Sequence, residues 1–110
     1  MMGKGTLVKS FIKGSGGSVV SGADNTSLDV KAGTIYDFGV IDTLVLTSVE
    51  TSYKESVIYF TTDSTITFTD NSGLKWGGDG SAPSGLEANT IYCIAICNGL
   101  AEIDSFGSAS

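Results

Sequence analysis

Short apolar or alternating segments, separated by turn residues, run along most of the chain. Ile66 and Phe68 alternate with threonines over 65–69, as in a half-buried antiparallel strand. Residues 43–49 form a nearly continuous apolar run, which is typical of a strand covered on both faces. No window keeps a period of 3.6 for more than two turns, so little or no helix is expected. The other predicted strands are 6–13, 18–21, 28–31, 34–40, 56–62, 91–97 and 100–105.

The turn signals between these strands recur about every 8–12 residues, which is the spacing of sandwiches and barrels. The sequence therefore predicts an all-β fold, a small antiparallel β-sandwich of jelly-roll type. Residues 14–17 (GSGG) have the composition of a flexible hinge. They divide the chain into an N-terminal arm or edge strand, 1–17, and a single sandwich domain, 18–110. No internal repeat of fixed period is visible.

A C-terminal hairpin is the best-defined predicted element. Asn98-Gly99 lies between two apolar runs, and a type I′ turn needs positive φ at both of these positions. Counting outward pairs Cys97 with Leu100, Ile96 with Ala101, Ala95 with Glu102 and Ile94 with Ile103. One face then carries Tyr92, Ile94, Ile96, Ala101 and Ile103, and belongs on the core. The opposite face carries Cys93, Ala95, Cys97, Glu102 and Asp104, and is expected to meet solvent or a partner.

The charge composition narrows the classes of function. The 110 residues include 12 acids and 6 lysines, no arginine and no histidine, for a formal net charge of −6. Without histidine there is no imidazole base, no Ser-His-Asp triad and no histidine metal ligand. Scattered lysines on an acidic chain make a poor surface for nucleic acid. The composition favours a binding or structural module over an enzyme, and it calls for no cofactor.

The two cysteines, Cys93 and Cys97, share one face of a predicted strand. Their side chains would be about 13 Å apart, which is too far for a disulfide between them. Two cysteines without histidine do not make a structural zinc site. The sequence shows neither an apolar run long enough to span a membrane nor a secretory h-region, so we expect synthesis in a reducing cytoplasm.

Trp76 is the single tryptophan and lies in the glycine-rich segment 73–80 (GLKWGGDG). One hypothesis is a carbohydrate- or receptor-binding tail module in which the Trp76 ring stacks on a sugar, with Asp79 as a hydrogen-bonding neighbour. The other has Trp76 plugging one end of the sandwich. The acids also leave open a calcium site in the Asp/Gly loops, or a glycosidase that holds two carboxylates across a cleft. Asp70-Asn71-Ser72-Gly73 is better explained as a turn capped by its aspartate.

Over residues 53–106 the chain resembles a small module of virion proteins of tailed bacteriophages. The resemblance depends on an ordered set of pieces: a Thr-rich strand (66–69), Lys75-Trp76 in a loop, a glycine-rich stretch into Ala82-Pro83, Leu86 to Thr90 leading into Ile91-Tyr92, and Ile94 to Ala101 with its tight turn. The two cysteines and the insertion 77–81 depart from the pattern.

This resemblance implies a non-catalytic structural component of a phage particle, such as an auxiliary or decoration capsid protein or a fibre-attachment protein. It implies location in the virion after synthesis in the bacterial host, with other capsid, fibre or tail subunits as partners, and a homo-oligomer. No nucleic acid or membrane partner is expected. An arm of residues 1–13 could add a strand to a neighbour. The predicted contact residues are Phe11, Ile12, Trp76, Asp79, Cys93 and Cys97.

Overall fold

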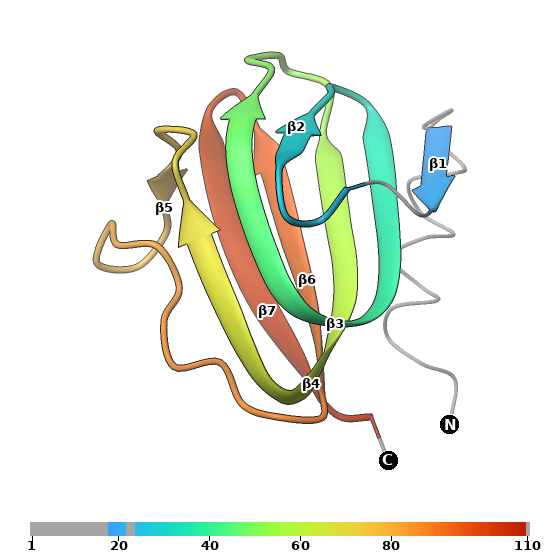
Figure 1. Cartoon of the computed structure of the whole chain (residues 1–110). Helices are drawn as coiled ribbons and strands as arrows, with labels where there is room; N and C mark the ends of the chain where they lie inside the picture. Colours follow the sequence, from blue (N-terminus) through green and yellow to red (C-terminus); the bar gives the residue numbers. More distant parts are fainter. Residues whose placement is uncertain (1–17, 22–23, 110) are drawn as a thin grey trace.

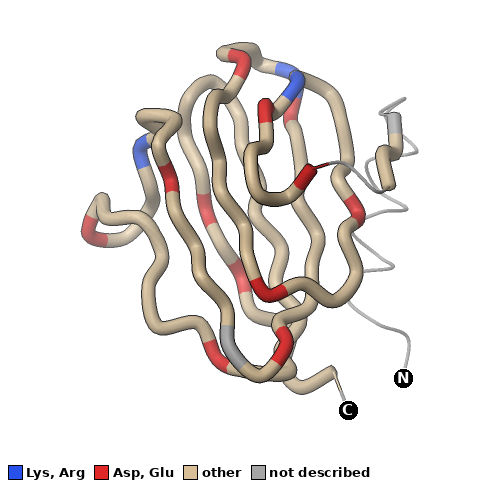
Figure 2. The backbone as a smooth tube through the Cα atoms, viewed as in Figure 1, with Lys and Arg blue, Asp and Glu red and all other residues tan. Residues whose placement is uncertain are grey.

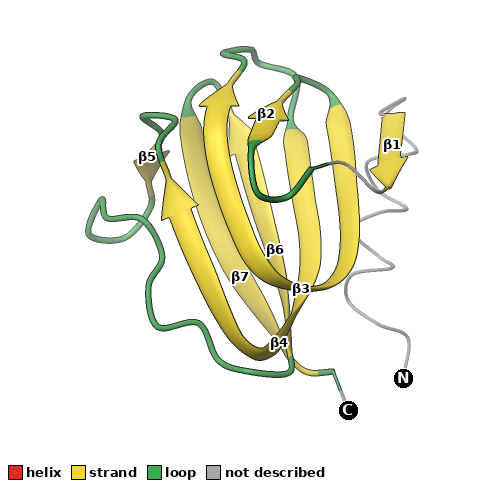
Figure 3. Cartoon of the chain, viewed as in Figure 1, coloured by secondary structure: helices red, strands yellow, loops and turns green. Residues whose placement is uncertain are grey.

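The computed structural model describes residues 18–21 and 24–109, and within them the chain forms one mixed β-sheet without a helix (Figure 3). Phe11, Ile12 and the whole predicted arm lie outside the described residues. The strands are β1 (Ser18–Ser21), β2 (Leu28–Val30), β3 (Thr34–Val49), β4 (Ser56–Asp70), β5 (Lys75–Trp76), β6 (Thr90–Cys97) and β7 (Leu100–Ser108). Their order in the sheet is β1-β3-β4-β6-β7-β5, and β2 pairs with β3 away from this path.

β3 and β4 are long strands that curve back on themselves, and they run parallel to one another (Figure 1). The first half of β3 pairs with the first half of β4, and the second half with the second half. The register slips between Asp37 and Gly39 and again between Ile41 and Thr43, where the strand curves. Gly39 has a φ of 69°, a conformation that glycine adopts without the steric cost of a side chain. Each long strand is therefore one turn of a coil rather than two separate strands.

This coiling corrects the predicted antiparallel sandwich. β1 and β2 both pair with β3 in parallel, so 18–70 stacks as successive parallel coils in the manner of a β-solenoid. The all-β prediction is confirmed, but 34–40 with 43–49, and 56–62 with 65–69, are continuous strands. The sandwich prediction was wrong because the turn signals at 32–33 and 50–55 connect one coil to the next. They do not reverse the chain into an antiparallel neighbour.

The starts of the coils carry a faint repeat that the sequence analysis missed. Ser18 pairs with Thr34 in the parallel register, and Val19 pairs with Ile35, which in turn pairs with Val57. Each coil thus starts with a small hydroxyl residue followed by a β-branched residue. The two spacings differ, 16 residues and then 22, so no fixed period marks the repeat.

The C-terminal hairpin of β6 and β7 agrees with its prediction. The pairs Cys97–Leu100, Ile96–Ala101, Ala95–Glu102 and Ile94–Ile103 are all present. Asn98 and Gly99 have φ values of 53° and 77°, as a type I′ turn requires. β6 also runs antiparallel to the first half of β4, so this hairpin ends the parallel stack.

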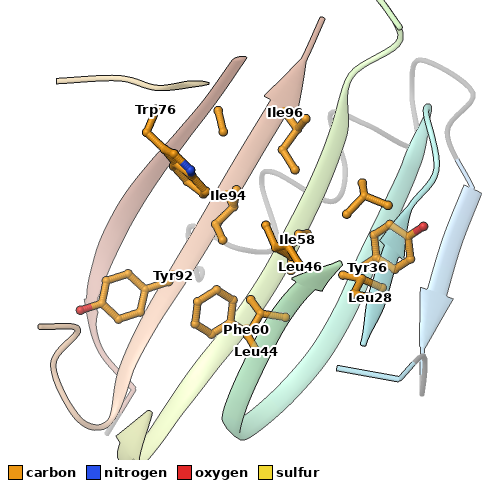
Figure 4. Close-up of a cluster of buried hydrophobic side chains, with 12 residues drawn as sticks. Leu28, Tyr36, Leu44, Leu46, Ile58, Phe60, Trp76, Tyr92, Ile94 and Ile96 are labelled. Carbon is orange, nitrogen blue, oxygen red and sulfur yellow. The ribbon is translucent and has the colours of Figure 1, made fainter. Parts of the chain in front are cut away.

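The main core lies inside the curve of the sheet (Figure 4). Phe60 of β4 stacks on Tyr92 of β6, with ring centroids 5.7 Å apart. The predicted inner face of the hairpin is buried here at Tyr92, Ile94, Ile96 and Ala101, while Ile103 is partly buried against it. The remaining members of this cluster are Leu28, Val30, Tyr36, Leu44, Leu46, Ile58 and Trp76.

Candidate functional site

Trp76 belongs to the core and does not present a binding face. Its side chain is only 7% exposed and meets Phe68 edge-on, with ring centroids 5.7 Å apart. Its indole Nε1–H donates to Asp70 Oδ2 at 2.7 Å. A ring buried this deeply has no free face on which a sugar could stack, which favours the alternative in which Trp76 plugs one end of the fold. The reason is that Phe68 and Asp70, both on β4, supply an apolar wall and an acceptor for the indole.

The segment that leads to Trp76 is tied by the same aspartate. Asp70 Oδ1 accepts the backbone N–H of Ser72 at 2.8 Å, so the predicted aspartate-capped turn is present. Asp79 is exposed and caps a similar turn, accepting the N–H of Ser81 at 2.9 Å. A shallow hollow of about 310 Å³ lies beside this loop. Its described lining is Trp76, Gly77, Gly78, Ser81, Pro83, Glu102, Ile103 and Asp104.

Hydrogen bonds from polar side chains, called polar ties below, hold the loop before β6 against the rest of the sheet. The buried Thr62 hydroxyl donates to the carbonyl of Glu87 at 2.6 Å and accepts the N–H of Thr90 at 2.9 Å. The Tyr92 hydroxyl accepts the N–H of Glu87 at 2.8 Å. Asn89 has a φ of 51°, in the left-handed region that asparagine tolerates best among non-glycine residues. The residues that carry the resemblance in this stretch thus serve to close the fold.

Cys93 and Cys97 lie on the outer face of the sheet, opposite the core, and both are free thiols. Cys93 is buried in a second, smaller apolar cluster with Ile35 and Val57, against which Phe106 packs. Burial raises the pKa of the Cys93 thiol to about 12, and the carboxylates of Asp104 and Glu55 add to the rise. Cys97 is half-buried, and its Sγ donates to the carbonyl of Tyr53 at 3.4 Å.

A groove of about 330 Å³ opens on this outer face beside the Asn98-Gly99 turn. Ala95 and Cys97 belong to its lining, together with Tyr53, Glu55, Asn98, Leu100, Ala101 and Glu102. Of the predicted contact residues, Cys97 is the one that lines the groove. Trp76 lines the separate hollow beside β7, and Cys93 is buried.

Sequence reasoning missed Tyr53 and Glu55 as site residues, and it placed Leu100 and Glu102 only as hairpin positions. One signal was available for Tyr53, an aromatic residue in an otherwise polar turn, 50–56. The position of this turn against the hairpin depends on contacts between distant residues. Asn98 N–H donates to the carbonyl of Ser52 at 2.7 Å, 46 positions earlier in the chain.

Acidic residues are distributed over most of the described surface, and the few described lysines lie mainly at the loop end near β2 and near β5 (Figure 2). Among the described residues, no cluster of three or more histidines, cysteines or acids is placed to hold a metal ion. The described part of the chain also contains no helix of the length and apolarity that crossing a membrane requires. Comparisons with protein-family models, curated proteins and solved structures find no match for this chain.

Proposed function

We propose that this chain is a non-catalytic structural component of a tailed-bacteriophage virion, an auxiliary or decoration capsid protein or a fibre-attachment protein. Its partners are then other virion subunits, with copies of itself among them. The proposal starts from the ordered set of pieces in residues 53–106 that resembles virion modules. In the fold these pieces form the end of β4, the loop around Trp76 that is hydrogen-bonded to it, and the β6–β7 hairpin.

The observation that carries the proposal is the difference between the two ends of the stack. At one end the antiparallel hairpin β6–β7 stops the parallel coils. At the other end, no strand within the described residues pairs with the outer edge of β1 or of β2. Within the described residues, a stack that ends in an antiparallel hairpin on one side and in an unpaired parallel edge on the other suits a module that is attached to a larger assembly by a single side. A neighbouring subunit that adds a strand there would continue the coils.

Particle purification tests this proposal directly. Phage particles from a host that expresses the chain in its natural context would be banded in a density gradient, washed, and analysed by quantitative mass spectrometry. We expect the chain to band with the particles at a fixed ratio to the major capsid protein through repeated gradients. A chain that stays in the soluble fraction, or whose ratio falls with each wash, would overturn the proposal.

Solution mass adds the second part of the test. Light scattering of the purified full chain over a range of concentrations should give a closed oligomer, such as a trimer, because the proposal includes self-association. A monomer at every concentration would contradict the proposed self-association. Attachment to a different virion subunit would then be the remaining part of the proposal.

A further inference from the structure

The groove beside the Asn98-Gly99 turn gathers exposed apolar surface. Large exposed hydrophobic side chains are few in the described residues, and two of them, Tyr53 at 82% and Leu100 at 57% exposed, line this one groove. Ala95 and Cys97 lie between them and are themselves half-buried. Exposed apolar side chains that converge on one hollow, unlike scattered ones, mark a surface that a partner covers.

The sheet register explains why the surface is hollow at this point. Cys97 stands opposite Leu100 and Ala95 opposite Glu102, so small side chains on β6 lie next to longer ones on β7. On the other side Glu55 directly precedes Ser56, which pairs with Ile96 of β6. The Tyr53 turn is held beside the hairpin by Asn98 N–H on the carbonyl of Ser52 and by Cys97 Sγ on the carbonyl of Tyr53. The walls of the groove are therefore positioned by hydrogen bonds.

The charge of the groove has one sign. Among the described residues that line it, Glu55 and Glu102 are carboxylates and none is a cation. The negative charge on this face also affects the neighbouring thiol, since Asp104 and Glu55 contribute, after burial, to the raised pKa of Cys93. An anionic ligand is repelled here. A neutral ligand such as a sugar can hydrogen-bond to the carboxylates through its hydroxyls, but it leaves their negative charge without a counter-charge. A long basic side chain complements both features, because its aliphatic stem covers the apolar floor and its charged end faces the carboxylates.

We infer that this groove binds a lysine or arginine side chain presented by another protein. The aliphatic stem of that side chain lies over Ala95 and Cys97 and contacts Leu100, as long basic side chains do on apolar surfaces. Its charged end lies on the Glu55 side of the groove, within reach of the Tyr53 ring for a cation–π contact, while Glu102, whose Oε1 would lie 3.3 Å from a Cβ on Gly77, adds negative charge from the β5 side. The inference that the partner is a virion subunit depends on the proposed function, whereas the chemistry of the groove does not.

A titration of the isotope-labelled full chain, followed by amide NMR signals, tests the inference with Ac-Gly-Lys-Gly-NH2 as the probe. We expect saturable shifts at Glu55, Ala95, Cys97 and Leu100, weak in affinity because a single side chain is bound. The matched probe is the same peptide with an acetylated lysine, which keeps the stem and removes the charge. Glu55→Gln and Glu102→Gln should each weaken binding about two- to fivefold, as expected for exposed charge pairs. Asp42→Asn, an exposed acid outside the groove, should change nothing.

Three results would overturn the inference. Equal shifts with the acetylated peptide would show that charge is not recognised. Shifts spread evenly over the acidic residues, and unaffected by Glu102→Gln, would show that the groove does not select the cation. Shifts of the groove signals by methyl α-glucopyranoside, without a response to the lysine peptide, would assign the groove to a carbohydrate. None of these outcomes depends on whether the chain bands with particles, so failure of the groove and failure of the proposed function are distinguishable.

Discussion

The parallel coils of residues 18–70 and the closing part of residues 75–108 are stabilised in different ways. In the coils, β3 and β4 pair along most of their length, and side chains of the same kind stack from one strand to the next, as Ile35 does on Val57. In the closing part, β6 pairs antiparallel with β4 and with β7, the short β5 pairs parallel with β7, and the loops are held by side-chain hydrogen bonds such as that from Trp76 to Asp70. The coils repeat a pattern, whereas the closing part interrupts it.

This difference shows which part of the chain determines where the stack of coils ends. A coil can be stacked on any strand with the same period of apolar residues, so the coils alone define neither their number nor their end. The polar ties have fixed partners, and leaving a buried donor or acceptor without its partner costs about 1–3 kcal/mol. The closing part therefore determines where the stack stops. Substitutions at the junction between the two parts should therefore have larger effects than substitutions within either part.

The largest effect is expected at the junction itself. Phe60→Ala removes a fully buried ring that stacks on Tyr92 across β4 and β6, so the free energy of unfolding should fall by about 3–5 kcal/mol. Urea denaturation followed by circular dichroism measures this change. Val40→Ala, at a site 66% exposed on β3, serves as the control and should stay within about 0.5 kcal/mol. Equal losses for the two variants would contradict the packing described for Phe60.

The next effect concerns the tie between β4 and the loop before β6. Thr62→Val keeps the shape of the side chain but removes the hydroxyl that contacts Glu87 and Thr90, so about 1–3 kcal/mol should be lost. Hydrogen exchange should rise first at Glu87 to Thr90. Thr67→Val on the same strand is exposed and should be nearly neutral. A Thr62→Val protein as stable as the wild type would mean that this tie does not hold the closing part.

Two glycine substitutions, one in the coils and one in the hairpin, should lower the free energy of unfolding by similar amounts. Gly39 in the coils and Gly99 in the hairpin have φ values of 69° and 77°, and an added Cβ would meet no atom within 4 Å at either site. Gly39→Ala and Gly99→Ala should therefore each lose about 1 kcal/mol from backbone strain alone. Calorimetry of both variants should show one transition, since Phe60 and Tyr92 couple the parts. Two transitions in either variant would show that the coils and the closing part unfold independently.

The smallest effect at neutral pH concerns Cys93. An unfolded thiol ionises near pH 8.5, whereas the folded one has a pKa of about 12. Between these values unfolding releases a proton, so this thiol lowers the free energy of unfolding as the pH rises. We expect the wild type to lose more stability than Cys93→Ala between pH 8 and pH 10, measured by urea denaturation. Cys97→Ala is the control and should follow the wild type, and Cys97 should react with a thiol reagent before Cys93.

The sequence was informative where contacts are local. The register of β6 and β7 follows from Asn98-Gly99, because a two-residue turn fixes which residues face each other. The turn capped by Asp70 was predictable for the same reason, because its hydrogen bond joins residues only two positions apart. The parallel pairing of β3 with β4 was not predictable in the same way, because it joins residues 21 to 24 positions apart whose connection can take many forms. The groove was missed for the same reason, since Tyr53 reaches the hairpin through a bond between Ser52 and Asn98.

The first residues of successive coils lie next to one another, and this has a consequence for how the length of the stack can change. Residues 34–55 form one complete turn that begins with Thr34 and delivers the chain to Ser56, its successor in the next turn. A duplication of that segment would add one further layer and lengthen the stack by about 4.8 Å, the spacing between paired strands. The hairpin would move outward as a unit, with its groove unchanged. The length of the stack could therefore change in steps of one strand spacing, while the hairpin that ends it stays the same.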